Sequence, residues 1–127
     1  MISRRALLLT TALLAAAPYG ASAAEPFDEA AFAAAQGAGR PVIVEVTAPW
    51  CPICKAQRPL LKALSEQPRF KDLAVYEIDF DTQKALMRRF DARMQSTLIV
   101  FKGREEVGRS VGETQGEWIE ALVEKAL

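Results

Sequence analysis

Cys51 and Cys54 are the residues of this chain best suited to chemistry, and they lie two residues apart in the stretch APWCPICKAQRP. They are the only cysteines among 127 residues, and the chain contains no histidine. Cysteines with this spacing serve in proteins as a redox-active dithiol, as half of a metal site or as a small structural disulfide. The composition of the chain and the residues around the pair distinguish these uses.

The metal and structural uses are poorly supported by the composition. A tetrahedral zinc site takes about four ligands, whereas this chain offers two thiols and no imidazole. The pair would hold a metal ion or an iron–sulfur cluster only by bridging two copies in a dimer, an alternative that stays open at this point. A purely structural disulfide between Cys51 and Cys54 is disfavoured, because the stabilisation from loop closure grows with loop length.

The flanking sequence places the pair between a strand and a helix. Residues 41–48 (PVIVEVTA) form an almost continuous apolar run, which predicts a strand buried on both faces. Residues 55–67 carry leucines at helical spacing, and Pro59 within them predicts a kink. The first turn of a helix has unpaired N–H groups and a partial positive charge. We therefore expect Cys51 to have a lowered pKa and to act as a nucleophile.

The remaining elements complete an α/β order, helix–strand–helix–strand–helix–strand–strand–helix. The first half is a βαβ unit with parallel strands and a right-handed crossover, and the second half is an antiparallel hairpin turning at Gly103-Arg104. One domain follows, with a four-stranded mixed sheet flanked by helices on both faces. The other predicted elements are helices at 28–37, 82–92 and 114–127 and strands at 73–81, 96–103 and 105–112. Predicted core residues include Phe80, Met87, Phe90, Met94, Trp118, Ile119, Leu122 and Val123.

Together these features resemble the thioredoxin family over residues 27–127. APWCPICK is similar to the family's W-C-x-x-C-K active site, and Pro59 stands where the family has its kink proline. STLIVFKG followed by EVGRSVG resembles the family's last hairpin, including Gly112. The resemblance implies the thioredoxin fold and a protein thiol–disulfide oxidoreductase that needs no dissociable cofactor. Cys51 would attack a substrate disulfide, and Cys54 would resolve the mixed disulfide.

The resemblance also implies a substrate-binding surface. Trp50, Pro52 and Ile53 would flank an exposed Cys51 sulfur, while Gln95 and Ser96 would present backbone to an extended substrate segment. Ser96 stands where the family has a cis-proline, and since a cis bond before another residue costs ~2.5–4 kcal/mol, we expect a trans bond. The Ser96 hydroxyl or N–H would hydrogen-bond a thiolate. Alternatively, Ser96 is an ordinary polar loop residue.

Glu45 lies within the apolar strand, six residues before Cys51. Either its carboxylate reaches a solvated edge, or it matches the family's buried aspartate, whose raised pKa would let it take the proton of Cys54. The resemblance favours the second role. Where the family has a lysine on the neighbouring strand, this chain has Glu77, which we expect to point outward. If Glu77 faced Glu45 instead, like charges would hold one of them protonated.

Residues 1–24 are typical of a cleavable signal peptide. Arg4 and Arg5 precede an apolar run over residues 6–17, and small residues lead to a cleavage site near Ala23 or Ala24. The run is short of the ~20 residues of a membrane anchor, which is the alternative. A general secretory signal fits better than a twin-arginine signal, since adjacent arginines are common. We expect residues 25–127 to form the mature domain in a bacterial periplasm, where disulfides persist.

The charge balance and the residues between the cysteines bear on partners. Sixteen basic and sixteen acidic residues leave no patch for nucleic acid. The family's strong oxidants and isomerases commonly carry a histidine between the cysteines, whereas Pro52 and Ile53 favour a reductant or a moderate redox carrier. The expected partners are protein disulfides or dithiols and a membrane electron donor, and the expected state is a monomer. A non-catalytic thioredoxin-like binding module is a further alternative.

Overall fold

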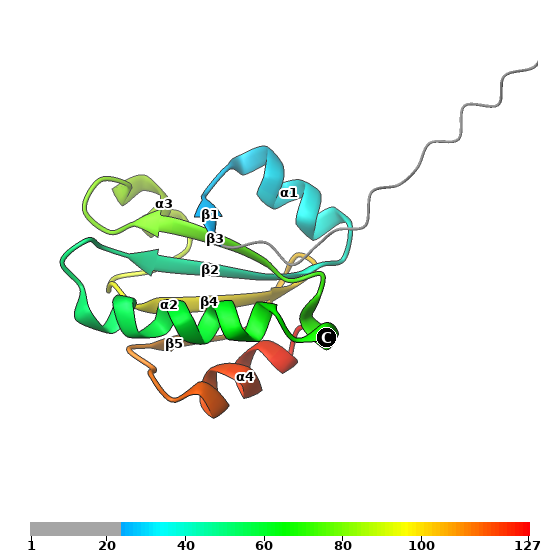
Figure 1. Ribbon diagram of the computed structural model, residues 1–127. Helices are drawn as coiled ribbons and strands as arrows, with labels where there is room; N and C mark the ends of the chain where they lie inside the picture. Colours follow the sequence, from blue (N-terminus) through cyan, green and yellow to red (C-terminus); the bar gives the residue numbers. More distant parts are fainter. Residues whose placement is uncertain (1–23) are drawn as a thin grey trace, which may run out of the picture.

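The apolar run before the cysteines forms β2 (Pro41–Thr47), the central strand of a five-stranded sheet with the order β1-β3-β2-β4-β5. The computed structural model describes residues 24–127 (Figure 1). The first six residues of β2 are buried, as expected for a strand covered on both faces. β2 runs parallel to one neighbour and antiparallel to the other, so the sheet is mixed as predicted. The neighbouring strands are β3 (Ala74–Asp79), β4 (Thr97–Lys102) and β5 (Glu105–Val111).

The prediction of four strands was wrong by one. β1 (Glu25–Pro26) pairs in parallel with β3, and the N–H of Phe27 donates to the Glu77 carbonyl at 2.9 Å. A two-residue strand is too short to show the alternation by which a strand is identified from sequence. Because β1 pairs with β3, the chain from Glu25 onward is held against the edge of the sheet.

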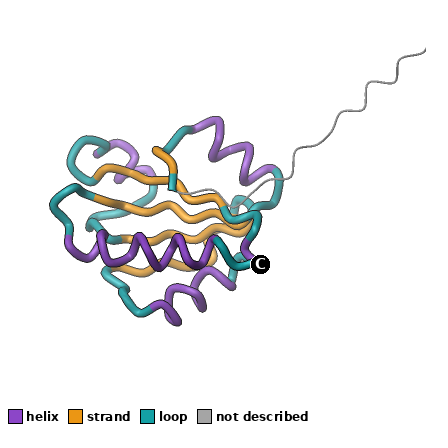
Figure 2. Tube along the Cα trace, in the orientation of Figure 1, coloured by secondary structure: helices purple, strands orange, loops and turns teal. Residues whose placement is uncertain are grey.

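Two helices cover each face of the sheet (Figures 1 and 2). α1 and α3 pack on one face, and α2 and α4 pack on the other. The predicted cap of the first helix is present, since the Asp28 carboxylate accepts from the Ala31 N–H at 2.8 Å. The helices are α1 (Glu29–Gly37), α2 (Pro52–Ser65), α3 (Lys84–Arg89) and α4 (Gly116–Glu124), with a 3₁₀ turn at Pro68–Phe70.

Alternate residues of β2 build the two cores. Val42, Val44 and Val46 face α1 and α3, whereas Ile43 faces α2 and α4. Both clusters, as the structure describes them, consist of residues between 27 and 126. The domain that follows residue 23 therefore contains both cores, and Glu45 lies on the face that carries α2.

Two predicted core residues lie on the surface instead. Trp118 is 60% exposed and Met94 is 50% exposed, whereas Met87 is buried and Phe80 and Phe90 are half-buried against the core. Trp118 precedes the inward stripe of α4 by one residue, which rotates its side chain away from the sheet. The buried stripe consists of Ile119, Leu122 and Val123, as predicted. No helix within residues 24–127 is long and apolar enough to cross a membrane, and the predicted signal peptide lies outside the described residues except for Ala24.

Candidate active site

Cys51 and Cys54 form a disulfide at the beginning of α2, with their Cα atoms 5.3 Å apart. Cys51 is the N-cap of the helix, and its sulfur accepts from the Cys54 N–H at 3.1 Å. Pro52 occupies the first helical position, where its missing N–H removes no hydrogen bond. The positive end of the helix and this N–H donor would both stabilise a thiolate at Cys51. The sequence-predicted pair is thus placed where it gains nucleophilic character.

Both cysteines are buried in this oxidised form, contrary to the expected exposure of the Cys51 sulfur. Cys51 is 1% exposed and Cys54 is 3% exposed, because the pair packs with Ala48 against the half-buried Phe80. Trp50 is 54% exposed, and it is held edge-on to Phe80 with their ring centroids 6.0 Å apart. Its indole N–H donates to Asp81 at 2.7 Å. Trp50 therefore lies as a fixed apolar surface beside the disulfide.

Ser96 holds its loop next to Cys54. The Ser96 N–H donates to the Val46 carbonyl at 2.8 Å, and the same carbonyl lies 3.8 Å from the sulfur of Cys54. Ser96 is buried and has a φ of +58°, a left-handed conformation that is unusual for a residue with a side chain. No peptide bond within residues 24–127 is cis, so the Gln95–Ser96 bond is trans as expected.

The donors of Ser96 are not available to a thiolate, which corrects one expectation from the sequence. Its N–H is bonded to Val46, and its hydroxyl donates to the Gln95 carbonyl at 2.6 Å. Its own carbonyl accepts from the Gly112 N–H at 3.0 Å. The left-handed backbone turns these groups toward neighbouring strands and turns, so Ser96 serves to position the loop.

Gln57 is a site residue that the sequence analysis missed. It lies one helical turn after Cys54, is 1% exposed, and donates from Nε2 to the carbonyls of Ser96 at 3.2 Å and Glu113 at 2.9 Å. One side chain thus ties α2 to the loop before β4 and to the loop before α4. The signal in the sequence was a polar residue at a helical position expected to be buried. Its partners could not be inferred from the sequence, because they are 39 and 56 residues away along the chain.

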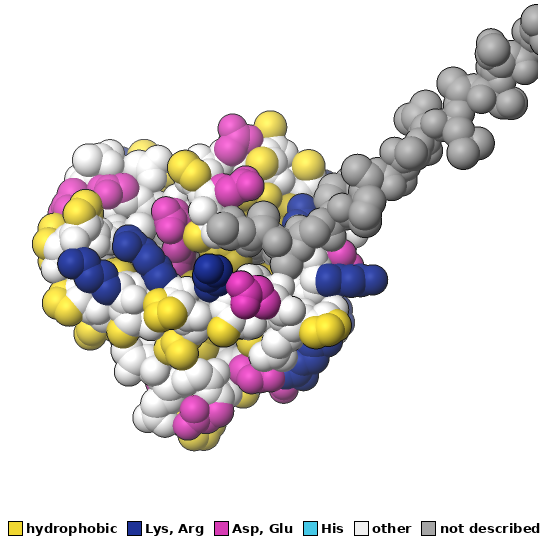
Figure 3. All heavy atoms as spheres, in the orientation of Figure 1, with side chains coloured by type: hydrophobic (Ala, Val, Ile, Leu, Met, Phe, Trp, Pro, Cys, Tyr) yellow, Lys and Arg dark blue, Asp and Glu magenta, His cyan; other side chains and the backbone are white. Residues whose placement is uncertain are grey.

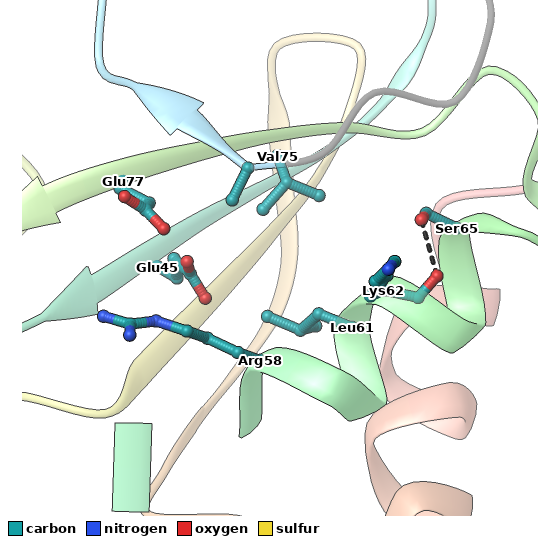
Figure 4. A pocket seen from close by; sticks show the side chains of 8 residues that line it. Glu45, Arg58, Leu61, Lys62, Ser65, Val75 and Glu77 are labelled. Carbon is teal, nitrogen blue, oxygen red and sulfur yellow. Dashed lines mark hydrogen bonds between the residues drawn. The ribbon is translucent and has the colours of Figure 1, made fainter. Parts of the chain in front are cut away.

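Glu45 and Glu77 face each other, so the expectation that Glu77 points outward was wrong. β2 and β3 pair in parallel with Glu45 opposite Glu77, which puts both side chains on the α2 face (Figure 4). Glu45 is 3% exposed, and its Oε1 has no hydrogen-bond partner. The pKa of Glu45 is raised to about 8, chiefly by burial and then by the hydrogen bond and charge of the Glu77 carboxyl. The charge of Arg58 acts in the opposite direction and lowers the pKa. Glu45 is thus held largely protonated at neutral pH, as expected of a buried carboxyl that faces a like charge.

A cavity of about 240 Å³ opens beside this carboxyl pair. It lies between α2, the strands β2 and β3 and Ala24, which precedes β1, and Figure 4 shows Glu45 and Arg58 at one end and Ser65 at the other. Its lining residues are Ala24, Glu45, Arg58, Leu61, Lys62, Ser65, Val75 and Glu77. The cavity combines apolar walls with carboxyl groups and cationic side chains, so it suits a small polar group.

The charges outside the site are mixed. On the face that carries α2 and α4, acidic and basic side chains are interspersed (Figure 3). Within residues 24–127, no group of three or more aspartate, glutamate, histidine or cysteine side chains is arranged to hold a metal ion.

Comparisons with known proteins agree on one family. The thioredoxin family model matches residues 23–125. The thioredoxin Asp f 29 of Aspergillus fumigatus is 38% identical over 77 residues, which are 61% of this chain and 69% of that protein. A bifunctional thioredoxin reductase/thioredoxin of Mycobacterium leprae is 34% identical over 69% of this chain, but the match spans only 19% of that protein. Among solved structures, Trxlp from Edwardsiella tarda is 45% identical with a TM-score of 0.75, covering 79% of this chain and 97% of that one.

Proposed function

The chain belongs to the thioredoxin family and is a thiol–disulfide oxidoreductase, and we propose that it acts in a bacterial periplasm as a reductant or moderate redox carrier for protein disulfides. The observation that carries the reaction is the N-cap position of Cys51, whose sulfur accepts the Cys54 N–H. The layout of residues 1–24 supports export. Pro52 and Ile53 place no charge between the cysteines, which supports the assignment as a reductant.

The reaction proceeds by two sulfur exchanges. The Cys51 thiolate attacks one sulfur of the substrate disulfide, so a mixed disulfide forms and one substrate thiolate leaves. The Cys54 thiolate then attacks the Cys51 sulfur, the mixed disulfide breaks, and the second substrate thiolate leaves. Two electrons pass from the dithiol to the substrate, and the Cys51–Cys54 disulfide of this structure is the product. A membrane electron donor would restore the dithiol.

Glu45 is proposed to accept the Cys54 proton before the second exchange. It lies next to Val46, whose carbonyl contacts the Cys54 sulfur, and on the sheet face that α2 covers. With a pKa of about 8, its carboxyl titrates in the same range as a thiol. Proton transfer between groups of similar pKa is nearly balanced, which suits a general base.

The substrate surface is proposed to be the exposed apolar area around the disulfide. Trp50 and Ile53 are 54% and 41% exposed, and Pro52 is exposed between them. Met94 is 50% exposed in the loop that Ser96 anchors. The N–H and carbonyl of Ser96 are bonded within the protein, and the Gln95 carbonyl accepts from the Ser96 hydroxyl, so the backbone group proposed to meet an extended substrate is the Gln95 N–H.

Equilibration of the protein with glutathione tests the direction of electron flow. A potential near about −270 mV would support a reductant, whereas one near about −120 mV would contradict it.

Fractionation of cells that express the full chain tests export, with the protein expected in the periplasmic fraction. A Cys54→Ser variant should trap substrates as mixed disulfides through Cys51. Anaerobic purification tests the dimeric metal or cluster alternative, because a metal-free monomer excludes it.

A Cys51→Ser variant separates the enzyme from a binding module. The enzyme would lose all turnover in a disulfide-reduction assay, whereas a binding module would keep its function. Gln95→Pro, which removes the offered N–H, and Ile53→Ser test the substrate surface, since both should weaken capture of substrate while leaving the potential of the disulfide nearly unchanged.

A further inference from the structure

Ala24 closes one side of the cavity beside Glu45 and Glu77. β1 runs parallel to β3 with Glu25 opposite Tyr76 and Pro26 opposite Glu77. Side chains alternate along a strand, so Ala24 lies beside Val75 on the face of Glu77, and Val75 lines the same cavity. Ala24 is therefore held at the cavity by strand pairing of the residues that follow it.

The charged groups around the cavity leave one carboxylate oxygen without a partner. Glu45 contributes a carboxyl from β2 and Glu77 contributes one from β3, while Arg58 and Lys62 face the cavity from α2. The Arg58 guanidinium donates to the Thr47 hydroxyl at 3.2 Å. On β4 the residue paired with Glu45 is the apolar Leu98. Glu45 Oε1 remains buried and unpartnered in the described chain, so the site favours one further cationic hydrogen-bond donor.

We propose that the α-ammonium group of Ala24, formed when a signal peptidase hydrolyses the Ala23–Ala24 bond, docks in this cavity and pairs with the Glu45–Glu77 carboxyl pair. Hydrolysis adds one water, leaving a carboxylate on the released segment and an ammonium on Ala24. Before cleavage the same nitrogen is an uncharged amide. The inference rests on the proposed export, since it requires removal of the residues before Ala24.

Removal of the residues before Ala24 would therefore change the pKa of Glu45, the proposed general base of the active site. An ammonium group beside Glu45 favours the carboxylate form and lowers the pKa of Glu45 from its raised value. A carboxyl that titrates at about 8 is ionised in roughly a tenth of molecules at pH 7, and a drop of about one unit raises this to about half. This larger ionised fraction is partly offset by the weaker basicity of the carboxylate, so removal of the Cys54 proton at pH 7 would be faster, but by less than the change in ionised fraction. The ammonium pKa would rise in return, because the two charges stabilise each other.

The first test identifies the start of the mature chain. The full chain with a C-terminal tag is expressed in a bacterium and purified from the periplasm, and its first residue is determined by mass spectrometry. We expect Ala24. A chain that begins at Glu25, or one that keeps the preceding residues, overturns the proposal.

The second test measures the pairing directly and does not depend on export. Residues 24–127, which contain both cores, are produced behind a cleavable leader that leaves Ala24 first, and the Glu45 carboxyl carbon is titrated by NMR before and after leader removal. We expect the pKa of Glu45 to fall by about one unit or more on removal, a tenfold change in its ionisation equilibrium. A change below about 0.3 unit refutes the docking.

A reciprocal measurement supplies the matched control. Titration of the Ala24 ammonium should show a raised pKa that falls in a Glu45→Gln variant. Glu25→Gln removes a carboxylate that is adjacent in sequence but lies opposite Tyr76 on the other sheet face. This variant should therefore lower the pKa of the Ala24 ammonium less than Glu45→Gln does. A larger drop in Glu25→Gln than in Glu45→Gln would overturn the proposal. A disulfide-reduction assay on the same samples separates the hypotheses, because an inactive protein with the pKa shift intact refutes the proposed function and leaves the docking standing.

Discussion

Ionisation of the buried Glu45 should destabilise the fold as the pH rises. Its pKa is raised from 4.5 to about 8 in the folded chain, chiefly by burial. A carboxyl with a raised folded pKa gives its full stability below the unfolded pKa and loses it as the pH rises through the folded pKa. From these two values, the free energy of unfolding should fall by ~3 kcal/mol between pH 4 and 7 and by ~5 kcal/mol at pH 9.

Glu45→Gln removes this penalty, because the amide stays neutral at every pH. We expect the variant to match the parent near pH 4 and to exceed its stability by ~3 kcal/mol at pH 7. Urea unfolding from pH 4 to 9 measures the difference, with the disulfide intact and Ala24 amide-linked in every sample. The exposed Glu105 provides the control, since Glu105→Gln should change stability by less than ~0.5 kcal/mol. Parallel curves for Glu45→Gln and the parent from pH 5 to 9 would refute the reasoning.

The site supports three further predictions. Cys51→Ser should abolish disulfide reduction, whereas Cys54→Ser should keep the first exchange and accumulate mixed disulfides on non-reducing gels; turnover by Cys51→Ser would contradict the assigned nucleophile. Gln57→Leu should cost ~2–4 kcal/mol in urea unfolding, because two buried carbonyls lose their donor, and a cost below ~0.5 kcal/mol would mean that they are otherwise satisfied. Ser96→Pro should destabilise by ~3 kcal/mol or more, since proline cannot adopt a φ of +58° and lacks the donated N–H; parental stability would show that the loop rebuilds.

The parts of the fold that follow local patterns were predictable. The strand before the cysteines has an apolar run that needs cover on both faces, and the helix after them has helical spacing and an N-terminal proline. Asp28 is a capping residue directly before a helix-forming run. Each of these signals lies within one element, so it can be identified without knowledge of its neighbours.

The features that depend on strand pairing were not predictable in the same way. Glu77 faces Glu45 because of the register between β2 and β3, which alternation along a single strand does not reveal. β1 exists only because β3 offers an open edge. Ser96 adopts a left-handed backbone because bonds to Val46 and Gly112 hold it there, although its residue type disfavours that conformation. Tertiary bonds override local preference at each of these positions.

The two carbonyls that Gln57 binds lie 39 and 56 residues away along the chain. α2 can form from local contacts, but these hydrogen bonds require that β4 and the loop before α4 have already reached their places. Long-range contacts of this kind form late in folding, since their loop-closure entropy must be offset by other contacts first. Cys51 gains its N-cap position as soon as α2 forms, because the N–H that its sulfur accepts belongs to Cys54 of the same helix. A chain in which α2 has formed but Gln57 is still unbonded would therefore already carry the nucleophile, before the loop that borders it has reached its place.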